Sequence, residues 1–168
     1  MKKFFWGLGV GVVAILAGEI LFMTQGGMPV STRGGPLPLE RLLAGRALRV
    51  AVGKEANRTS PLPADEANLL SGAKVYQNNC AVCHGLLDES QRSPIGLGMY
   101  PPPPALLEPQ TGVTDDPVGE TFWKVKNGIR LTGMPRFEGA LKEEEMWQVS
   151  LLLQKADDLP PAVMRALK

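Results

Sequence analysis

The chain of 168 residues has two cysteines and one histidine, and all three lie within one short run, Cys80-Ala81-Val82-Cys83-His84. Two cysteines are too few for a disulfide framework or for an all-cysteine zinc site. One histidine excludes any site that needs two histidines from this chain. The formal net charge is +1, so the chain as a whole offers no basic field that would hold nucleic acid. The sequence therefore concentrates its chemistry in this run.

The spacing Cys-x-x-Cys-His is the attachment signature of c-type haem. Two thiols one helical turn apart can add to the two vinyl groups on one edge of the porphyrin, and the adjacent imidazole then reaches the iron. A thioredoxin-type pair would need a βαβ context, which the surrounding sequence lacks, and zinc would need a fourth ligand. A buried pair of structural cysteines is the remaining alternative. The run predicts one covalent haem c, with Cys80 and Cys83 as thioether sites and His84 as an iron ligand.

The second axial ligand has to be something other than histidine, and methionine is the natural choice. Met134 lies in the segment 128–135, Gly-Ile-Arg-Leu-Thr-Gly-Met-Pro, between two helical patterns. Glycine and proline there favour an extended backbone that can direct the sulfur at the iron. Met99, in a second loop closer to His84, is the alternative, whereas Met146 belongs to an apolar helical stripe. We expect His84 and Met134 to be the axial ligands.

Residues 4–23 form an apolar run that only Glu19 interrupts. As a helix this run spans roughly 30 Å, the thickness of the hydrocarbon core of a bilayer. Lys2 and Lys3 precede it, and because positive residues stay in the cytoplasm, the rest of the chain should be exported. A cleaved signal peptide is the alternative, but the expected small-residue cleavage site is poor. We predict a single-pass anchor in a bacterial inner membrane with the haem domain on the periplasmic side.

Small residues recur along one side of this run, at Gly7, Gly11, Ala14 and Gly18. Such a stripe allows two membrane helices to approach closely. The sequence thus raises the hypothesis that the anchor packs against a partner helix in a membrane complex.

Beyond the anchor, residues 24–38 are rich in glycine and proline and are typical of a spacer. Residues 39–52 then alternate leucines and arginines at the spacing of a short amphipathic helix, which would lie on the exported domain or on anionic lipid. We expect three parts: an anchor at 1–23, a linker at 24–64, and a cytochrome domain at 65–168 with a short C-terminal tail. Residues 1–64 carry 8 basic and 3 acidic residues, and residues 65–168 carry 10 and 14, which favours a partner surface of basic character.

Over residues 65–158 the chain resembles the class I cytochrome c family. The resemblance rests on motifs that occur in the family's order: Leu69-x-x-Gly72-x-x-x-Tyr76, Cys80-x-x-Cys83-His84-Gly85, Pro104-x-Leu106, Phe122-Trp123-x-x-x-Asn127-Gly128, Gly133-Met134-Pro135 and Met146-Trp147-x-x-Ser150-Leu151.

The resemblance implies roles for two residues of the third motif, Pro104-x-Leu106. It implies that the carbonyl of Pro104 accepts a hydrogen bond from His84 and that Leu106 packs on the haem. The proline run 101–104 is longer than usual in the family, which leaves open which proline makes this contact. Trp123 is a further candidate for a haem contact, with ordinary core packing as the alternative.

The expected fold is all-α: a class I cytochrome c fold, with three to five helices around one covalent haem, preceded by one transmembrane helix. The first helix of the domain should begin with Asp65 as its N-cap and end near the haem run. The middle helix should have Asp116 as its N-cap with Pro117 as its first residue, and the last should span about 142–155. Gly72 should let the first helix cross close to the last.

These features predict a one-electron carrier on the periplasmic face of a respiratory chain, with redox proteins or a membrane respiratory complex as partners. A permanent haem subunit of a membrane oxidoreductase complex is the alternative. A filled sixth coordination position argues against an enzyme, and a peroxidase-like activity with an open site ranks third.

Overall fold

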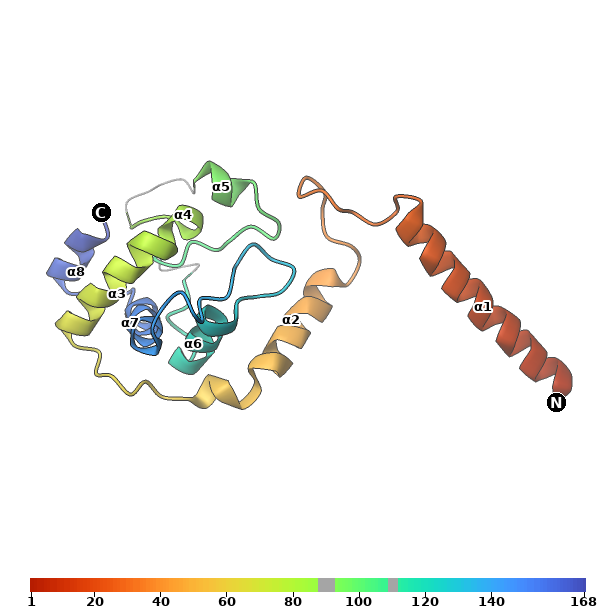
Figure 1. Ribbon diagram of the computed structural model, residues 1–168, viewed down its shortest axis with the longest axis horizontal. Coiled ribbons are helices and arrows are strands. Elements are labelled where there is room, and N and C mark those ends of the chain that lie inside the picture. The colour runs from red at the N-terminus through yellow and green to blue at the C-terminus, as the bar shows by residue number, and fades with distance from the viewer. Residues whose placement is uncertain (88–92, 109–111) are drawn as a thin grey trace. The chain divides into compact units, whose positions relative to one another are not determined.

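The computed structural model describes residues 1–87, 93–108 and 112–168, which form two compact units, Met1–Pro38 and Leu39–Lys168. Throughout these described residues the regular structure is helical, with no β-strand (Figure 1). The predicted all-α class is confirmed.

The first unit contains helix α1, Lys2–Thr24, and none of its residues is buried. A window of this helix has a mean hydropathy of 2.0, and the helix is long and apolar enough to cross a membrane. It ends where glycines and Pro29 follow, with the hydroxyl of Thr24 donating to the carbonyl of Ile20 at 2.8 Å. A signal sequence has the same length and composition, so the retained anchor stays a prediction.

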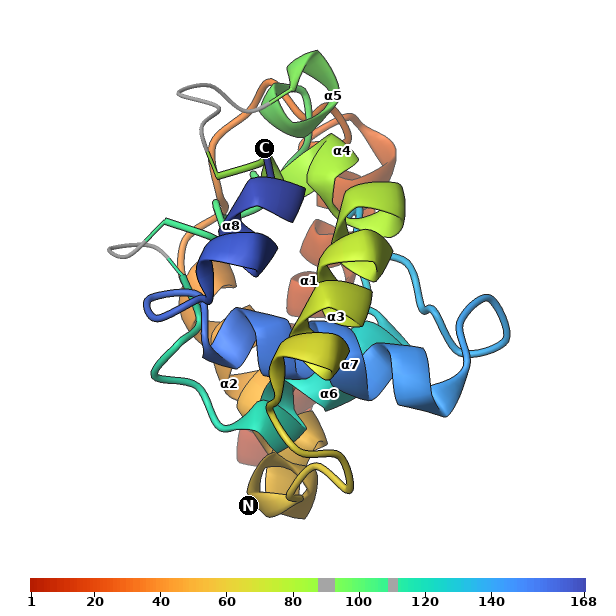
Figure 2. The ribbon, with the colours of Figure 1, turned by 90° about the vertical axis from the view of Figure 1, so that its left-hand side faces the viewer.

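The core of the second unit lies among helices α3 (Glu66–Asn79), α6 (Val118–Asn127), α7 (Glu143–Gln154) and α8 (Pro161–Ala166). Figure 2 shows α3 crossing α7, with α8 beside α3. The largest fully buried side chains include Trp147, Tyr76 and Phe122. The rings of Phe122 and Trp147 stack with centroids 3.8 Å apart, a geometry worth about 1 kcal/mol beyond the burial of the rings.

Gly72 lies at the crossing of α3 and α7. A Cβ atom at this position would collide with the backbone carbonyl of Gln148, so only glycine permits this separation of the two helices. The predicted close crossing is therefore confirmed.

Of the two helix N-caps that the sequence predicted, one is confirmed and the other is wrong. Asp65 caps α3, its carboxylate accepting from the backbone N–H of Asn68 at 2.9 Å. The prediction for α6 is wrong by one residue, because Pro117 rather than Asp116 is the N-cap. The carboxylate of Asp116 instead binds the ammonium of Lys124 at 2.9 Å.

Helices outside the family motifs complete the second unit. Helix α2 (Glu40–Val52) and the 3-10 helix η1 (Gly53–Asn57) pack against α6 within the unit Leu39–Lys168. At the other end, the expected tail forms α8, and Val163 and Leu167 are fully buried. The division of the chain at residues 24 and 65 stays a prediction.

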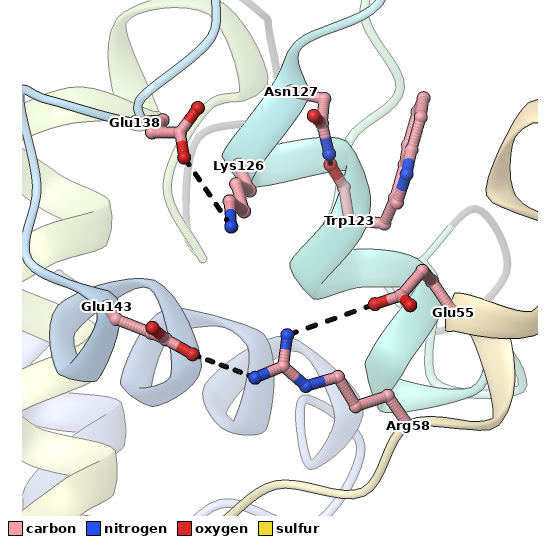
Figure 3. A network of polar contacts seen from close by, with 7 residues as sticks. All are labelled: Glu55, Arg58, Trp123, Lys126, Asn127, Glu138 and Glu143. Atoms are coloured by element: carbon pink, nitrogen blue, oxygen red, sulfur yellow. Dashed lines mark hydrogen bonds and ion pairs between the residues drawn. The ribbon is translucent and has the colours of Figure 1, made fainter.

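Figure 3 shows Arg58, which follows η1, between the carboxylates of Glu143 and Glu55. Its guanidinium lies 2.8 Å from the carboxylate of Glu143 and 3.8 Å from that of Glu55. The same group lies 5.0 Å from the centroid of Phe122 and 5.2 Å from that of Trp147. Arg58 thus connects η1 to α7 over the stacked aromatic pair.

Candidate metal centre

The two cysteines and the histidine lie where α3 ends. Cys80 is the C-cap of α3, and the short helix α4, Ala81–His84, continues from it. The carbonyl of Cys80 accepts from the N–H groups of Cys83 at 3.1 Å and of His84 at 3.0 Å. Both cysteines are free thiols, and both line the same cavity as His84. The helical turn therefore brings the three predicted residues to one wall.

Gly85 ends this turn with a φ of +79°, a conformation that disfavours residues with a side chain. Its N–H donates to the carbonyl of Ala81 at 2.9 Å, and its carbonyl accepts from the buried hydroxyl of Tyr76 at 2.8 Å. The tyrosine thereby fixes the chain directly after His84. Tyr76, a core residue of α3, therefore helps to position the imidazole of His84.

The Nδ1 atom of His84 donates to the carbonyl oxygen of Pro104 at 2.7 Å. With the proton on Nδ1, the lone pair of Nε2 is left for a metal. Burial lowers the pKa of His84, and the hydrogen bond to Pro104 only partly offsets this. The imidazole is therefore held neutral, which is the form that binds iron.

The proline segment forms a second wall of the cavity. Pro101, Pro102, Pro103 and Pro104 all line it, together with Leu106. Among these prolines it is the carbonyl of Pro104 that accepts from His84, as the family resemblance implied. Because proline has no backbone N–H, these four residues place few polar groups in the wall of the cavity.

Met134 lies in the loop between α6 and α7. Gly128 starts this loop with a φ of +67°. The N–H of Met134 donates to the hydroxyl of Thr132 at 3.1 Å, and that hydroxyl donates to the carbonyl of Ile129 at 2.6 Å. The carbonyl of Met134 accepts from the N–H of Ile129 at 3.2 Å. These bonds close the loop and hold Met134 in the cavity lining.

Met99 also lines the cavity. It packs against the Met134 loop so closely that a side chain at Gly133 would collide with its methyl group. The structure thus brings both candidate methionines to the same site. The choice of Met134 as the iron ligand stays a prediction.

Trp123 lies on α6. It is half-buried and is not part of the described cavity lining, which α6 supplies through Thr121, Lys124 and Val125. The carbonyl of Trp123 accepts from the amide of Asn127 at 2.9 Å (Figure 3). The haem contact by Trp123 stays a prediction.

The lining also includes residues that the sequence predictions did not single out, among them Leu48, Lys124 and Thr132. Lys124 pairs with Glu120 at 2.7 Å and with Asp116 at 2.9 Å. Burial lowers the pKa of Lys124, but the two carboxylates more than offset this, so its pKa lies above the usual value. The i,i+4 spacing of Glu120 and Lys124 on a helix could have predicted this ion pair from the sequence. Nothing in the local pattern shows that Leu48 or Thr132 would reach the cavity.

The cavity has a volume of about 250 Å³, and its lining is mostly apolar. Among the described lining residues, the sulfur and imidazole groups are two free thiols, one imidazole with Nδ1 already bonded, and two thioethers. Burial, together with the nearby Cys83, raises the pKa of Cys80 to about 12, so this thiol is protonated in the apolar lining. This donor set fits haem c, whose covalent attachment uses both thiols and whose iron takes an imidazole and a thioether.

An all-α unit in which the Cys-x-x-Cys-His turn, a proline segment and a methionine loop line one apolar cavity defines a class I monohaem cytochrome c. The family model described as cytochrome c oxidase, cbb3-type, subunit III matches residues 67–151, about half of the chain, and the chain belongs to this family. A comparison with curated proteins gives no match. The family implies a covalently bound haem c and haem-based electron transfer.

Proposed function

We propose that this chain is a membrane-anchored carrier of single electrons, with one haem c attached at Cys80 and Cys83 and coordinated by His84 and Met134. The observation that carries the proposal is the common cavity on which these four side chains meet. Haem c supplies one-electron Fe(III)/Fe(II) chemistry. The chain's own residues attach the group, fix the tautomer of His84 through Pro104 and exclude water with an apolar lining.

We also propose the location of this chemistry. Helix α1 is retained in a bacterial inner membrane, and Lys2 and Lys3 keep its N-terminus in the cytoplasm. The haem unit then lies on the periplasmic side, where haem c is attached and where a respiratory chain exchanges electrons. Mass spectrometry of the purified protein tests the anchor: the mass of the full chain plus one haem supports it, and a chain cut after α1 contradicts it.

Filling the sixth coordination position with Met134 leaves no open site for a substrate, which supports a carrier rather than an enzyme. A ferric spectrum of the low-spin type is expected. A high-spin spectrum with rapid binding of small ligands would instead support a peroxidase-like activity.

A permanent subunit of a membrane oxidoreductase complex is the second candidate, and two observations favour it. The matching family is described as a subunit of a cbb3-type cytochrome c oxidase. In α1, the small residues Gly7, Gly11, Ala14 and Gly18 lie on one side of the helix, which would let a partner helix approach closely.

Purification in mild detergent separates the two candidates. A carrier migrates alone as one haem protein, and a subunit migrates with other chains. In the second case, Gly11→Leu with Gly18→Leu should release the partners. Gly9→Leu, on the opposite side of α1, is the matched control and should leave them bound.

A further inference from the structure

Helix α2 has apolar side chains on two opposite sides. On one side Val52 is 3% exposed and Leu48 lines the haem cavity, so this side faces the cytochrome. On the other side the exposed fractions are 65% for Leu39, 60% for Leu43 and 73% for Val50. Leucines and valines are rarely this exposed at helical spacing unless something covers them.

The exposed side is also cationic. Leu39, Leu42, Leu43, Arg46, Arg49 and Val50 recur at intervals of three, four and seven residues, and we call this set the outer face of α2. Within the part of the chain that the structure describes, neither arginine of the outer face has a carboxylate partner. The one acidic residue of α2 is Glu40, at its start.

We propose that the outer face of α2 lies on the anionic phospholipid surface of the membrane that α1 spans. The inference rests on the proposed anchorage by α1. In this arrangement the leucines and Val50 enter the boundary between headgroups and acyl chains, and Arg46 and Arg49 bind phosphate groups. A short helix with one apolar and cationic side is the form that binds membrane interfaces.

The covalent connection favours the bilayer over a protein partner. The segment 25–39 joins α1 to α2 and spans at most about 50 Å when extended, so the membrane surface is always within reach. Such tethering raises the effective concentration of the surface and lets a weakly binding helix stay bound. An anionic bilayer also supplies apolar depth and negative charge together, which are the two complements of the outer face.

The arrangement has a consequence for the haem. Because Leu48 on the inner side of α2 lines the cavity, α2 would lie between the bilayer and the haem site. Membrane contact through α2 would then fix the orientation of the cavity relative to the membrane, where a flexible linker alone would leave it free.

Spin labels on the full-length, haem-loaded protein test this proposal. Haem attachment consumes both native cysteines, so a label on Val50→Cys is unique. The protein is placed in lipid nanodiscs, one chain per disc, made either of equal parts of phosphatidylglycerol and phosphatidylcholine or of phosphatidylcholine alone. In the anionic discs, the label at residue 50 should collide more with lipid-soluble oxygen than with an aqueous nickel chelate. Met164→Cys, an exposed site on α8, is the control and should give the opposite ratio.

Charge removal provides the second arm. Arg46→Gln with Arg49→Gln should return the label at residue 50 to water, as should discs of phosphatidylcholine alone. Arg136→Gln with Arg165→Gln removes two exposed charges elsewhere and should change nothing. An unchanged haem spectrum shows that each variant is folded.

Each remaining outcome overturns the proposal. A label at residue 50 that stays in water while the chain stays in the anionic disc leaves the anchor intact and refutes the role of α2. A label shielded equally in both kinds of disc means that protein covers this face. A chain that leaves the discs refutes the anchorage, and the role of α2 with it.

Discussion

The Nδ1 atom of His84 donates a hydrogen bond of 2.7 Å to the carbonyl oxygen of Pro104 across an apolar cavity wall. This bond fixes the tautomer of the imidazole and makes Nε2 more basic toward iron. Pro104 has a fixed φ, which holds its carbonyl in place. The acceptor for the His84 imidazole is therefore the backbone carbonyl oxygen of Pro104, and the pyrrolidine ring of the same proline restricts the backbone that carries it.

Replacing Pro104 by alanine should raise the reduction potential of the haem. A looser carbonyl leaves the imidazole less basic, and a less basic ligand stabilises Fe(III) less than before. A redox titration measures the change. Pro102→Ala, at a lining position without this bond, should leave the potential nearly unchanged, and an equal shift in both variants would argue against the role of Pro104.

Gly72→Ala should destabilise the second unit by about 1–3 kcal/mol, the usual cost of an added group in a packed site. The added methyl group has no room beside the carbonyl of Gln148. Guanidinium unfolding followed by circular dichroism gives the free energy. Gly45→Ala is the matched control, because its Cβ meets only the end of Arg49 at 3.7 Å. It should stabilise the chain or leave it unchanged, and equal losses in both variants would contradict this account of the crossing.

Trp147 is fully buried, and its indole Nε1 has no acceptor among the described residues. A buried donor without a partner costs about 1–3 kcal/mol. Trp147→Phe removes the donor and keeps a ring against Phe122, so its loss of stability should stay below about 1.5 kcal/mol. Trp147→Ala removes the stacking as well and should cost about 3–5 kcal/mol. Similar losses in the two variants would show that the indole nitrogen has a partner.

Lys124 should make the stability of the second unit depend on pH in the alkaline range. Its pKa lies above the usual 10.5 because the bonds to Glu120 and Asp116 outweigh the effect of burial. A raised pKa adds stability below pH 10.5, and this contribution is lost as the pH rises through the folded value. The difference in unfolding free energy between the native chain and Lys124→Gln should therefore shrink as the pH rises above 10.5 and through the raised pKa of Lys124.

The matched control for this measurement is Lys126→Gln. Among the described residues Lys126 pairs with Glu138 at 3.5 Å (Figure 3), and the change measured for Lys124→Gln is compared with the change for this variant. A difference for Lys124→Gln that grows with pH would reverse the sign and contradict the assignment.

The parts of the site that the sequence predicted are those in which neighbouring residues act together. The Cys-x-x-Cys-His run forms one helical turn, and the cap at Asp65 is a local bond to Asn68. The crossing at Gly72 was also predictable, because a glycine on a helical stripe has few other reasons to be there. In each case the determining contacts lie within a few residues or belong to a motif.

The parts that escaped prediction depend on distant contacts. Leu48 reaches the cavity only because α2 packs against α6, and α8 joins the core only through Val163 and Leu167. The hydroxyl of Thr132 closes the methionine loop by a bond that a polar loop residue need not make. Helix α6 contributes Thr121, Lys124 and Val125 to the described cavity lining, and its register relative to the cavity is set by packing against distant parts of the chain.

The most direct test of the central claim is the absorption spectrum of the oxidised protein, recorded after a pyridine haemochrome assay has established one covalent haem per chain. The native protein should show the far-red band of methionine-to-iron charge transfer. Met134→Ala should lose this band, and Met99→Ala, at the other thioether of the cavity, should keep it. Absence of covalent haem, absence of the band in the native protein, or its persistence in Met134→Ala would contradict a haem held between His84 and Met134.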